Sequence, residues 1–279
     1  MSHYTENLKK IYPKIGGDYE FSLECFTIGR LDGGPEKLSR PVMLIFPGGG
    51  YGFCSEREGM PIASAFAAKG FNCYVLYYSN KTVDGKSCFP DQLLEAYAAI
   101  DYIKNKADEH FSDPERISVC GFSAGGHLAA MTANLFDDEN VKKAFPDKRE
   151  DYFRPFASVL GYPVISSDDK IAHLDSFKNL TDNDANLIAK LSMEKRITKK
   201  TSPAFIWHTM DDMAVDCRNS LFYAAALREN DVNFELHVYP HGPHGISLAN
   251  EVTSMGIADL VNPVVEGWID DAARFIKEL

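Results

Sequence analysis

The feature that most limits the possible folds of this chain is a regular alternation of apolar strands with helices. Residues 42–46 are an unbroken apolar run, which is typical of a strand buried on both faces of a sheet, and residues 72–78 predict another buried strand. Further strands are predicted at residues 117–122, 157–162, 204–209 and 233–239. The intervening helices are predicted at residues 60–69, 90–103, 124–135, 218–228 and 264–279. This order predicts an α/β fold with a mostly parallel central sheet and helices on both faces.

Two other segments complete the expected organisation. Residues 21–28 alternate weakly and predict an edge strand or hairpin arm, followed by a turn at residues 31–35. Residues 166–201 lack a strand pattern, and two short amphipathic helices are predicted there, around residues 171–180 and 185–191. Such an insertion between core strands is expected to lie over the carboxyl edge of the sheet, as a small helical cap. An excursion that does not contact the substrate is the alternative. We expect residues 1–279 to form a single domain.

Composition excludes several classes of function. The formal net charge of -11 disfavours nucleic acid and anionic membranes as partners, and a small neutral substrate fits better. No apolar run is long enough to span a membrane, and residues 1–17 lack the apolar core of a secretory signal, so we expect a cytoplasmic location. The six cysteines have no paired spacing, which indicates reduced thiols and no metal site or cofactor. The oligomeric state stays open, with a homodimer as one alternative.

A candidate nucleophile stands where one predicted strand meets the next helix. Ser123 lies in the pattern Gly-x-Ser-x-Gly formed with Gly121 and Gly125. The pattern is informative in this setting because glycines relieve crowding in a strained strand-to-helix turn that exposes the serine hydroxyl. Ser123 is therefore predicted to attack substrate, provided that the chain also supplies a base and an acid.

The acid and the base are expected later in the chain, in that order. After the strand at 204–209, Asp212 is the preferred acid because Val215 can anchor its loop in the core, and Asp211 and Asp216 are its rivals. These aspartates could alternatively cap the helix that follows. After the last strand, His244 is the preferred base, with His241 as the alternative. The remaining histidines considered are assigned to packing or surface positions; these are His127, His208 and His237.

Backbone amides are predicted to stabilise the negative charge that forms on the carbonyl oxygen. The N–H of Ala124 directly follows the nucleophile, and Gly49 and Gly50 lie in a glycine-rich turn after an early strand. Glycines there let the backbone approach substrate without obstruction. A phosphate-binding loop is the alternative, but the turn lacks the Lys-Ser/Thr ending and the dinucleotide spacing.

From about Arg40 to the carboxyl end, the chain resembles the α/β-hydrolase superfamily. The resemblance is to the serine esterases of the acetyl-xylan esterase-like and hormone-sensitive-lipase-like branch. The segments that carry it are residues 47–51, 57–61, 121–127, 207–212 and 241–245. Two departures stand out: Pro47 replaces the histidine that usually precedes the glycines, and Asp216 replaces the usual proline. The first leaves open how the glycine loop is braced, and the second weakens the match of the acid loop.

The resemblance implies an esterase that works through an acyl-enzyme. The expected substrate is a short-chain ester, with acetate as the acyl group and a sugar or small oligosaccharide as the alcohol. The aromatic residues Tyr51, Phe53 and Tyr162 are candidates for apolar walls against a sugar face, with ordinary core packing as the alternative. A peptidase of the same fold and a catalytically silent binding module are the alternative functions.

Overall fold

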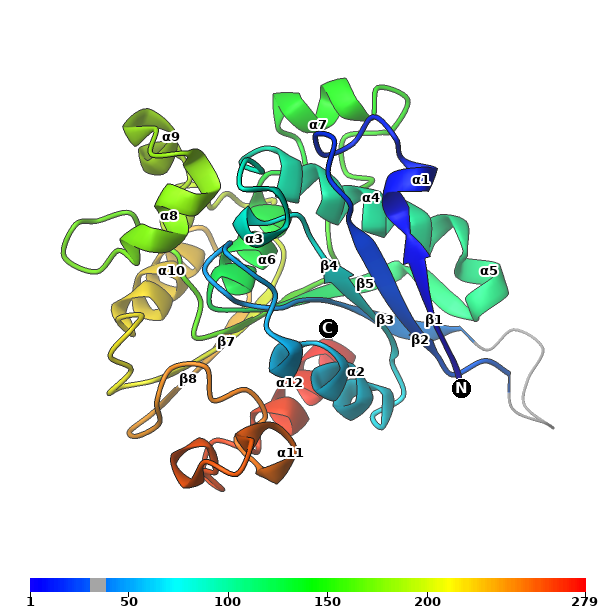
Figure 1. Ribbon diagram of the computed structural model, residues 1–279. Coiled ribbons are helices and arrows are strands. Elements are labelled where there is room, and N and C mark those ends of the chain that lie inside the picture. The colour runs from blue at the N-terminus through cyan, green and yellow to red at the C-terminus, as the bar shows by residue number, and fades with distance from the viewer. Residues whose placement is uncertain (31–38) are drawn as a thin grey trace.

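The computed structural model describes residues 1–30 and 39–279, which are built around one eight-stranded sheet (Figure 1). The strand order is β1-β2-β4-β3-β5-β6-β7-β8. The turn predicted at residues 31–35 lies outside the described residues. The strands are β1 (Ser2–Asn7), β2 (Ser22–Thr27), β3 (Arg40–Phe46), β4 (Asn72–Tyr77), β5 (Ser112–Phe122), β6 (Ser158–Gly161), β7 (Ala204–Thr209) and β8 (Phe234–Tyr239).

The sheet is parallel except at its amino-terminal edge. Strands β3 to β8 pair in parallel, whereas β1 pairs antiparallel with β2, and β2 pairs antiparallel with β4. The predicted mostly parallel sheet is therefore confirmed. Of the two alternatives predicted for residues 21–28, the edge strand is wrong, because β1 covers the outer side of β2 and is itself the edge strand. As expected of the other alternative, a hairpin arm, β2 pairs antiparallel with the preceding strand.

Helices cover both faces of the sheet, and alternate strand residues supply the two cores. In β3, Val42, Leu44 and Phe46 face one core, while Met43 and Ile45 face the other. This is the two-residue period expected of a strand buried on both sides. The first core contains α4, α6 and α10, and the second contains α2 and α12.

The helices described are α1 (Leu8–Ile11), α2 (Met60–Ala67), α3 (Lys81–Asp84), α4 (Asp91–Asn105), α5 (Ala107–His110), α6 (Ala124–Asn134), α7 (Glu139–Ala144), α8 (Leu174–Thr181), α9 (Ala185–Lys190), α10 (Arg218–Glu229), α11 (Glu251–Ser254) and α12 (Trp268–Glu278). Short 3-10 helices span Glu56–Glu58, Met193–Lys195 and Ala258–Leu260. The last helix begins at Trp268 instead of residue 264, because the preceding residues form a turn in which Val265 N–H bonds Asn262 O.

The order of the strands locates a binding crevice. From β3 the chain passes through α2 to β4 on one side, and it then crosses through α4 to β5 on the other side of β3. The helices α2 and α6, which follow β3 and β5, lie on opposite faces of the sheet. The loops after β3 and β5 consequently diverge, and in open α/β sheets ligands bind at such a switch point.

The insertion at residues 166–201 contains α8, α9 and the 3-10 helix Met193–Lys195, and no strand occurs within these described residues. The two helices pack on each other beside α10 (Figure 1). The insertion touches the glycine-rich turn, because the side-chain amide of Asn179 on α8 donates to the carbonyl of Gly50 at 2.9 Å.

Candidate active site

Ser123 occupies a strained turn between β5 and α6. Its backbone has φ 53° and ψ −119°, a left-handed φ that a non-glycine residue seldom adopts. The flanking glycines make the turn possible. A Cβ on Gly121 would lie 2.0 Å from the carbonyl oxygen of Gly125, and one on Gly125 would lie 2.1 Å from that of Phe46. The glycines are thus required by close backbone contacts, and the turn holds Ser123 at the carboxyl end of β5.

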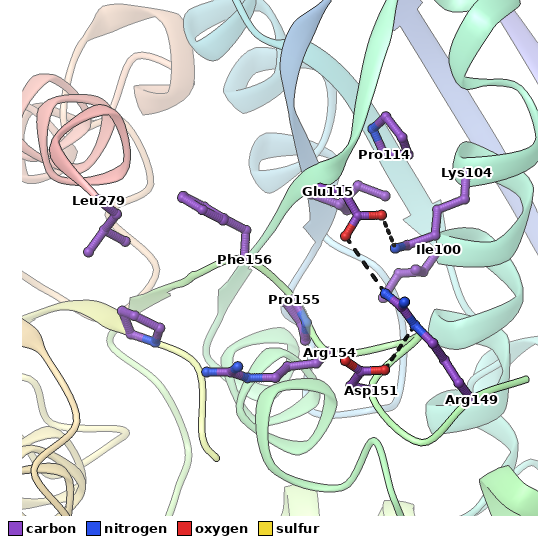
Figure 2. A pocket seen from close by; sticks show the side chains of 12 residues that line it. Ile100, Lys104, Pro114, Glu115, Arg149, Asp151, Arg154, Pro155, Phe156 and Leu279 are labelled. Carbon is purple, nitrogen blue, oxygen red and sulfur yellow. Dashed lines mark ion pairs between the residues drawn. The ribbon is translucent and has the colours of Figure 1, made fainter. Parts of the chain in front are cut away.

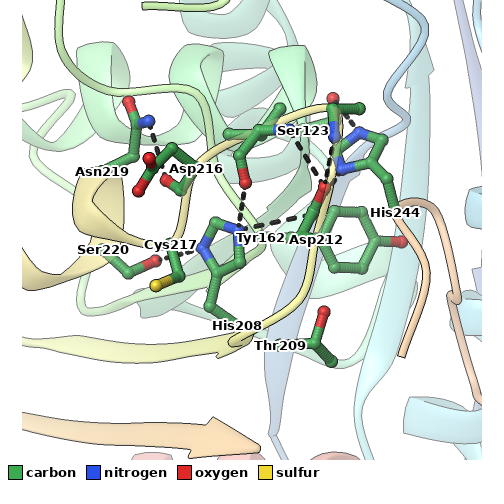
Figure 3. A network of polar contacts seen from close by, with 12 residues as sticks. Ser123, Tyr162, His208, Thr209, Asp212, Asp216, Cys217, Asn219, Ser220 and His244 are labelled. Carbon is green, nitrogen blue, oxygen red and sulfur yellow. Dashed lines mark hydrogen bonds and ion pairs between the residues drawn. The ribbon is translucent and has the colours of Figure 1, made fainter. Parts of the chain in front are cut away.

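Ser123, His244 and Asp212 form one chain of hydrogen bonds, although they come from three separate loops (Figure 3). The Nε2 atom of His244 lies 2.8 Å from Ser123 Oγ, and its Nδ1 atom lies 2.7 Å from Asp212 Oδ2. A carboxylate at Nδ1 accepts a hydrogen bond from the Nδ1–H group, which leaves Nε2 unprotonated and free to accept a proton from the serine. This geometry is that of a nucleophile, a base and an orienting acid.

Asp212 is fixed by its own loop and by a buried histidine. Its Oδ1 accepts the backbone N–H groups of Ala214 and Val215, both at 2.9 Å. On the side away from His244, the Nε2 atom of His208 lies 3.4 Å from Asp212 Oδ2 (Figure 3). Burial alone raises the pKa of Asp212, but the contacts with His208 and His244 outweigh it and hold the pKa well below its ordinary value. Asp212 therefore stays ionised beside the base.

His208 is fully buried, and its contact with Asp212 was not anticipated from the sequence. Its Nε2–H donates to the carbonyl of Val215 at 2.9 Å, and its Nδ1 lies 2.8 Å from the hydroxyl of Ser220. The ring is therefore fixed through both nitrogens, and it supports the loop that carries Asp212.

The rival residues make other contacts. Asp211 accepts the N–H of Gly242 at 2.8 Å and lies 3.1 Å from the exposed ring of His241, while Asp216 pairs with Arg218. Asp211 and His241 thus join the acid loop to the histidine loop at the surface, away from the hydroxyl of Ser123.

The glycine-rich turn lies beside Ser123 in a conformation that suits glycine. Gly49 has φ 127° and Gly50 has φ 63°, and both line a cavity of about 790 Å³ together with Ser123 and His244. Ala124 begins α6, so its N–H belongs to the first turn of the helix, where backbone donors have no partner within the helix. Gly49, Gly50 and Ala124 remain the predicted donors for the oxyanion.

The glycine-rich turn has Pro47 at the position where a histidine was expected from the resemblance. Three other side chains hold the turn in place. The carboxyl of Glu58 accepts the N–H of Gly48 at 2.8 Å, and the hydroxyl of Tyr78 donates to the carbonyl of Pro47 at 2.6 Å. Asn179 of the insertion holds Gly50, as described above. Sequence reasoning missed Glu58, although it lies in one of the segments that carry the resemblance.

The aromatic residues predicted to contact substrate have different positions. Phe53 is 56% exposed and lines the cavity, whereas Tyr51 and Tyr162 are each 1% exposed. The Tyr51 hydroxyl lies 2.9 Å from Nδ1 of His127, and the Tyr162 hydroxyl donates to Glu58 at 2.6 Å. The two tyrosines are therefore buried supports of the surrounding loops, and Phe53 remains the candidate for an apolar wall.

A second hollow, of about 340 Å³, lies at the opposite end of the sheet. Figure 2 shows Glu115 between Lys104 and Arg149 on its wall, and Arg149 also pairs with Asp151 at 2.9 Å. Ile117, which lines it, precedes Ser123 on β5 by six residues, or about 20 Å of extended chain. This hollow cannot share a substrate with Ser123.

The described residues contain neither a candidate metal site nor a helix that could span a membrane. Within residues 1–30 and 39–279, no group of three or more His, Cys, Asp or Glu side chains is arranged to hold a metal ion. No helix in the same part of the chain is long and apolar enough to cross a membrane. None of the six cysteines, all of which lie in the described part of the chain, forms a disulfide.

The described residues form a mostly parallel sheet with helices on both faces. At its carboxyl edge lie a strained turn with a serine and, in one chain of hydrogen bonds with it, a histidine and an aspartate. These features together define the class of α/β-hydrolases. Solved structures agree. The carboxylesterase Cest-2923 from Lactobacillus plantarum WCFS1 matches with a TM-score of 0.85 and 29% identity, over 100% of this chain and 98% of that one. An acetyl ester-xyloside bifunctional hydrolase from Caldicellulosiruptor lactoaceticus matches with a TM-score of 0.81 and 32% identity, over 99% and 96% of the two chains.

Sequence comparison narrows the class to a family. Residues 34–227 match the family described as BD-FAE, and because this match covers most of the chain, the chain belongs to that family. It is 34% identical over 221 residues to endo-1,4-beta-xylanase B of Butyrivibrio fibrisolvens, covering 77% of this chain and 34% of that protein. It is 27% identical over 252 residues to an acetylxylan esterase of Xylanibacter ruminicola, covering 88% of this chain and 48% of that protein. The chain thus spans half or less of the length of these two relatives. The predicted resemblance to α/β-hydrolase esterases is confirmed.

Proposed function

We propose that this chain is a serine carboxylesterase that removes short acyl groups, acetate above all, from acetylated sugars or small oligosaccharides. The observation that carries the proposal is the continuous hydrogen-bonded chain from Asp212 through His244 to Ser123. Such a chain activates a hydroxyl that is otherwise a poor nucleophile at neutral pH.

In the proposed mechanism, Ser123 Oγ attacks the ester carbonyl while His244 Nε2 takes its proton. Asp212 Oδ2 holds the Nδ1–H of the ring and stabilises the positive charge that forms on it. The amides of Ala124, Gly49 and Gly50 are the proposed donors to the oxyanion. His244 then protonates the departing alcohol, leaving an acyl-enzyme on Ser123. Water activated by His244 hydrolyses this intermediate and releases the carboxylic acid.

The proposed alcohol is a sugar, for two reasons. Among relatives, the Xylanibacter ruminicola protein is named an acetylxylan esterase and the Caldicellulosiruptor lactoaceticus protein an acetyl ester-xyloside hydrolase. In addition, His244 borders both the cavity of about 790 Å³ and a neighbouring hollow of about 720 Å³. An alcohol larger than a simple alkyl group therefore has room on the side of the base.

A labelling experiment tests the proposed activity. The parent protein is expected to react with a fluorophosphonate probe and to hydrolyse 4-nitrophenyl acetate, while Ser123→Ala is expected to do neither. A parent that is inert toward both reagents, or a Ser123→Ala variant that labels like the parent, would refute the proposal. The first result would favour a silent binding module.

Substrate panels test the finer assignment. We expect faster turnover of acetate than of butyrate or octanoate esters, and release of acetate from acetylated xylose and xylo-oligosaccharides. An aminoacyl anilide turned over faster than the aryl acetate would identify a peptidase instead.

A further inference from the structure

His173 belongs to the insertion at residues 166–201, yet it lines the same cavity as Ser123 and His244. It precedes α8 as the capping residue of that helix. Its helix is tied to the glycine-rich turn through Asn179 and Gly50. His173 is therefore held against the site by the insertion, and the mechanism above gives it no task.

The hydrogen bonds of the ring decide which nitrogen carries a proton. Nδ1 accepts the backbone N–H of Ser176 at 3.4 Å and lies 2.8 Å from the hydroxyl of the same residue. A ring nitrogen that accepts a backbone N–H has no proton in the neutral imidazole, so the proton resides on Nε2. Among the described residues, Nδ1 is the only ring nitrogen of His173 with a protein partner. The Nε2–H group is a donor that the fold leaves unused.

Burial favours the neutral form of the His173 ring, and the ring lines the same cavity as His244. Burial lowers the pKa of His173, and the charge of His244 lowers it further. Both rings line the cavity of about 790 Å³ that also contains Ser123, so an ester bound at Ser123 shares this space with both of them. His244 must protonate the departing alcohol, so the alcohol part of the ester lies beside His244 in this shared cavity.

We propose that the Nε2–H of His173 donates a hydrogen bond to a second oxygen of the alcohol, carried on the carbon next to the ester oxygen. This inference rests on the proposed function and deepens it, because it selects esters of vicinal diols. Sugar rings carry hydroxyls on adjacent carbons, whereas simple alkyl and aryl esters lack the second oxygen. The insertion would then contribute directly to the choice of alcohol.

A matched pair of substrates isolates this hydrogen bond. The monoacetate of trans-cyclohexane-1,2-diol and cyclohexyl acetate differ by one vicinal hydroxyl and share the same acyl group and ring. The quantity measured is the ratio of their kcat/KM values, with the diol ester in the numerator. We expect the parent protein to prefer the diol ester.

Two variants separate recognition of the alcohol from capping of α8. His173→Asn keeps a side-chain oxygen that can cap the helix but has no donor at the Nε2 position. We expect it to lower the ratio about three- to tenfold, the effect of one neutral hydrogen bond. His173→Gln carries an N–H near the Nε2 position but fits the cap poorly, so its ratio should stay closer to that of the parent. Lys178→Ala, on the exposed side of the same helix, is the matched control and should keep the parental ratio.

Each outcome has a distinct meaning. A lowered ratio in His173→Asn with retention in His173→Gln supports the inference. An unchanged ratio in His173→Asn, or a parent that hydrolyses both esters without preference, overturns it and leaves the esterase proposal standing. A parent that hydrolyses neither these esters nor 4-nitrophenyl acetate refutes the proposed function, and this inference falls with it.

Discussion

Glu58 connects two loops whose relative position matters to the reaction. One carboxyl oxygen accepts the N–H of Gly48 at 2.8 Å, and the other accepts the hydroxyl of Tyr162 at 2.6 Å. The Tyr162 ring lies edge-on to His244, with 5.1 Å between ring centroids, and its hydroxyl accepts the N–H of Ser247 at 3.1 Å. A single buried carboxyl therefore fixes the glycine-rich turn relative to the histidine loop.

We predict that Glu58→Gln lowers kcat for 4-nitrophenyl acetate about 10- to 100-fold and changes KM little. The amide offers one oxygen in place of two, so either Gly48 or the Tyr162 hydroxyl loses its acceptor. Both losses misplace groups that act chiefly in the transition state. Steady-state kinetics on the purified variant measure the effect.

A double-mutant cycle with Tyr162→Phe tests whether the two residues act together. If Glu58 acts through Tyr162, the double variant loses much less than the product of the two single losses. Strictly multiplicative losses would contradict the proposed connection. Thermal unfolding of each variant distinguishes a displaced loop from a destabilised fold.

At the scale of elements, α4 carries a buried acid that faces the loop after β4. Glu95 accepts the backbone N–H of Ser79 at 2.8 Å through one oxygen, and among the described residues its other oxygen has no hydrogen-bond partner. Burial raises the pKa of Glu95 from 4.5 to about 8. The folded protein thus holds Glu95 protonated near neutral pH.

The raised pKa predicts that stability falls as pH rises. The unfolded chain releases this proton near pH 4.5, and the folded chain releases it near pH 8. The protonated Glu95 therefore makes its full contribution to the free energy of unfolding below pH 4.5, and this contribution is lost as the pH rises to about 8. Glu95→Gln removes the titration. The quantity of interest is the free energy of unfolding of Glu95→Gln minus that of the parent. We expect this difference to be larger at pH 8 than at pH 4.5 by on the order of 3 kcal/mol.

Urea unfolding at both pH values measures this difference between the parent and Glu95→Gln. Glu139→Gln, whose side chain is 77% exposed, serves as the control and should follow the parent at each pH. Stability curves of parent and Glu95→Gln that run parallel between these pH values would contradict the prediction.

Elements that bury apolar residues were predictable, and elements held by other forces were not. The apolar run of β3 indicated a central strand because five consecutive residues fill two cores. Strand β1 escaped prediction because it is polar and mostly exposed, and its pairing with β2 stabilises it. Helix α7 was missed for a similar reason, since only Val141 is buried in it and Asp138 caps its start.

At the scale of the whole molecule, the grouping of the three candidate catalytic residues was predictable, but their supports were not. Their order along the chain, serine, acid and histidine, reflects the topology, because parallel strands deliver successive loops to one edge of the sheet. The supports were not predictable. Glu58 contacts Tyr162, which lies 104 residues further along the chain, and no local pattern predicts such a contact. The hydrogen bonds of His208 and His173 are to residues at most 12 positions away, but the places of these rings beside Asp212 and in the cavity depend on how the loops fold.

The net charge of the molecule predicts how it treats charged esters. A formal charge of -11 produces a negative potential that lowers the local concentration of anionic substrates, and added salt screens this potential. We expect kcat/KM for 4-nitrophenyl hemisuccinate, whose acyl group carries a carboxylate, to rise about threefold between about 20 mM and about 500 mM NaCl. 4-Nitrophenyl acetate is neutral and serves as the control, so its kcat/KM should change little over the same range. A fall in kcat/KM for the hemisuccinate ester as salt increases would contradict this prediction. It would mean that positive charges at the cavity, such as Arg57, outweigh the negative potential of the whole chain.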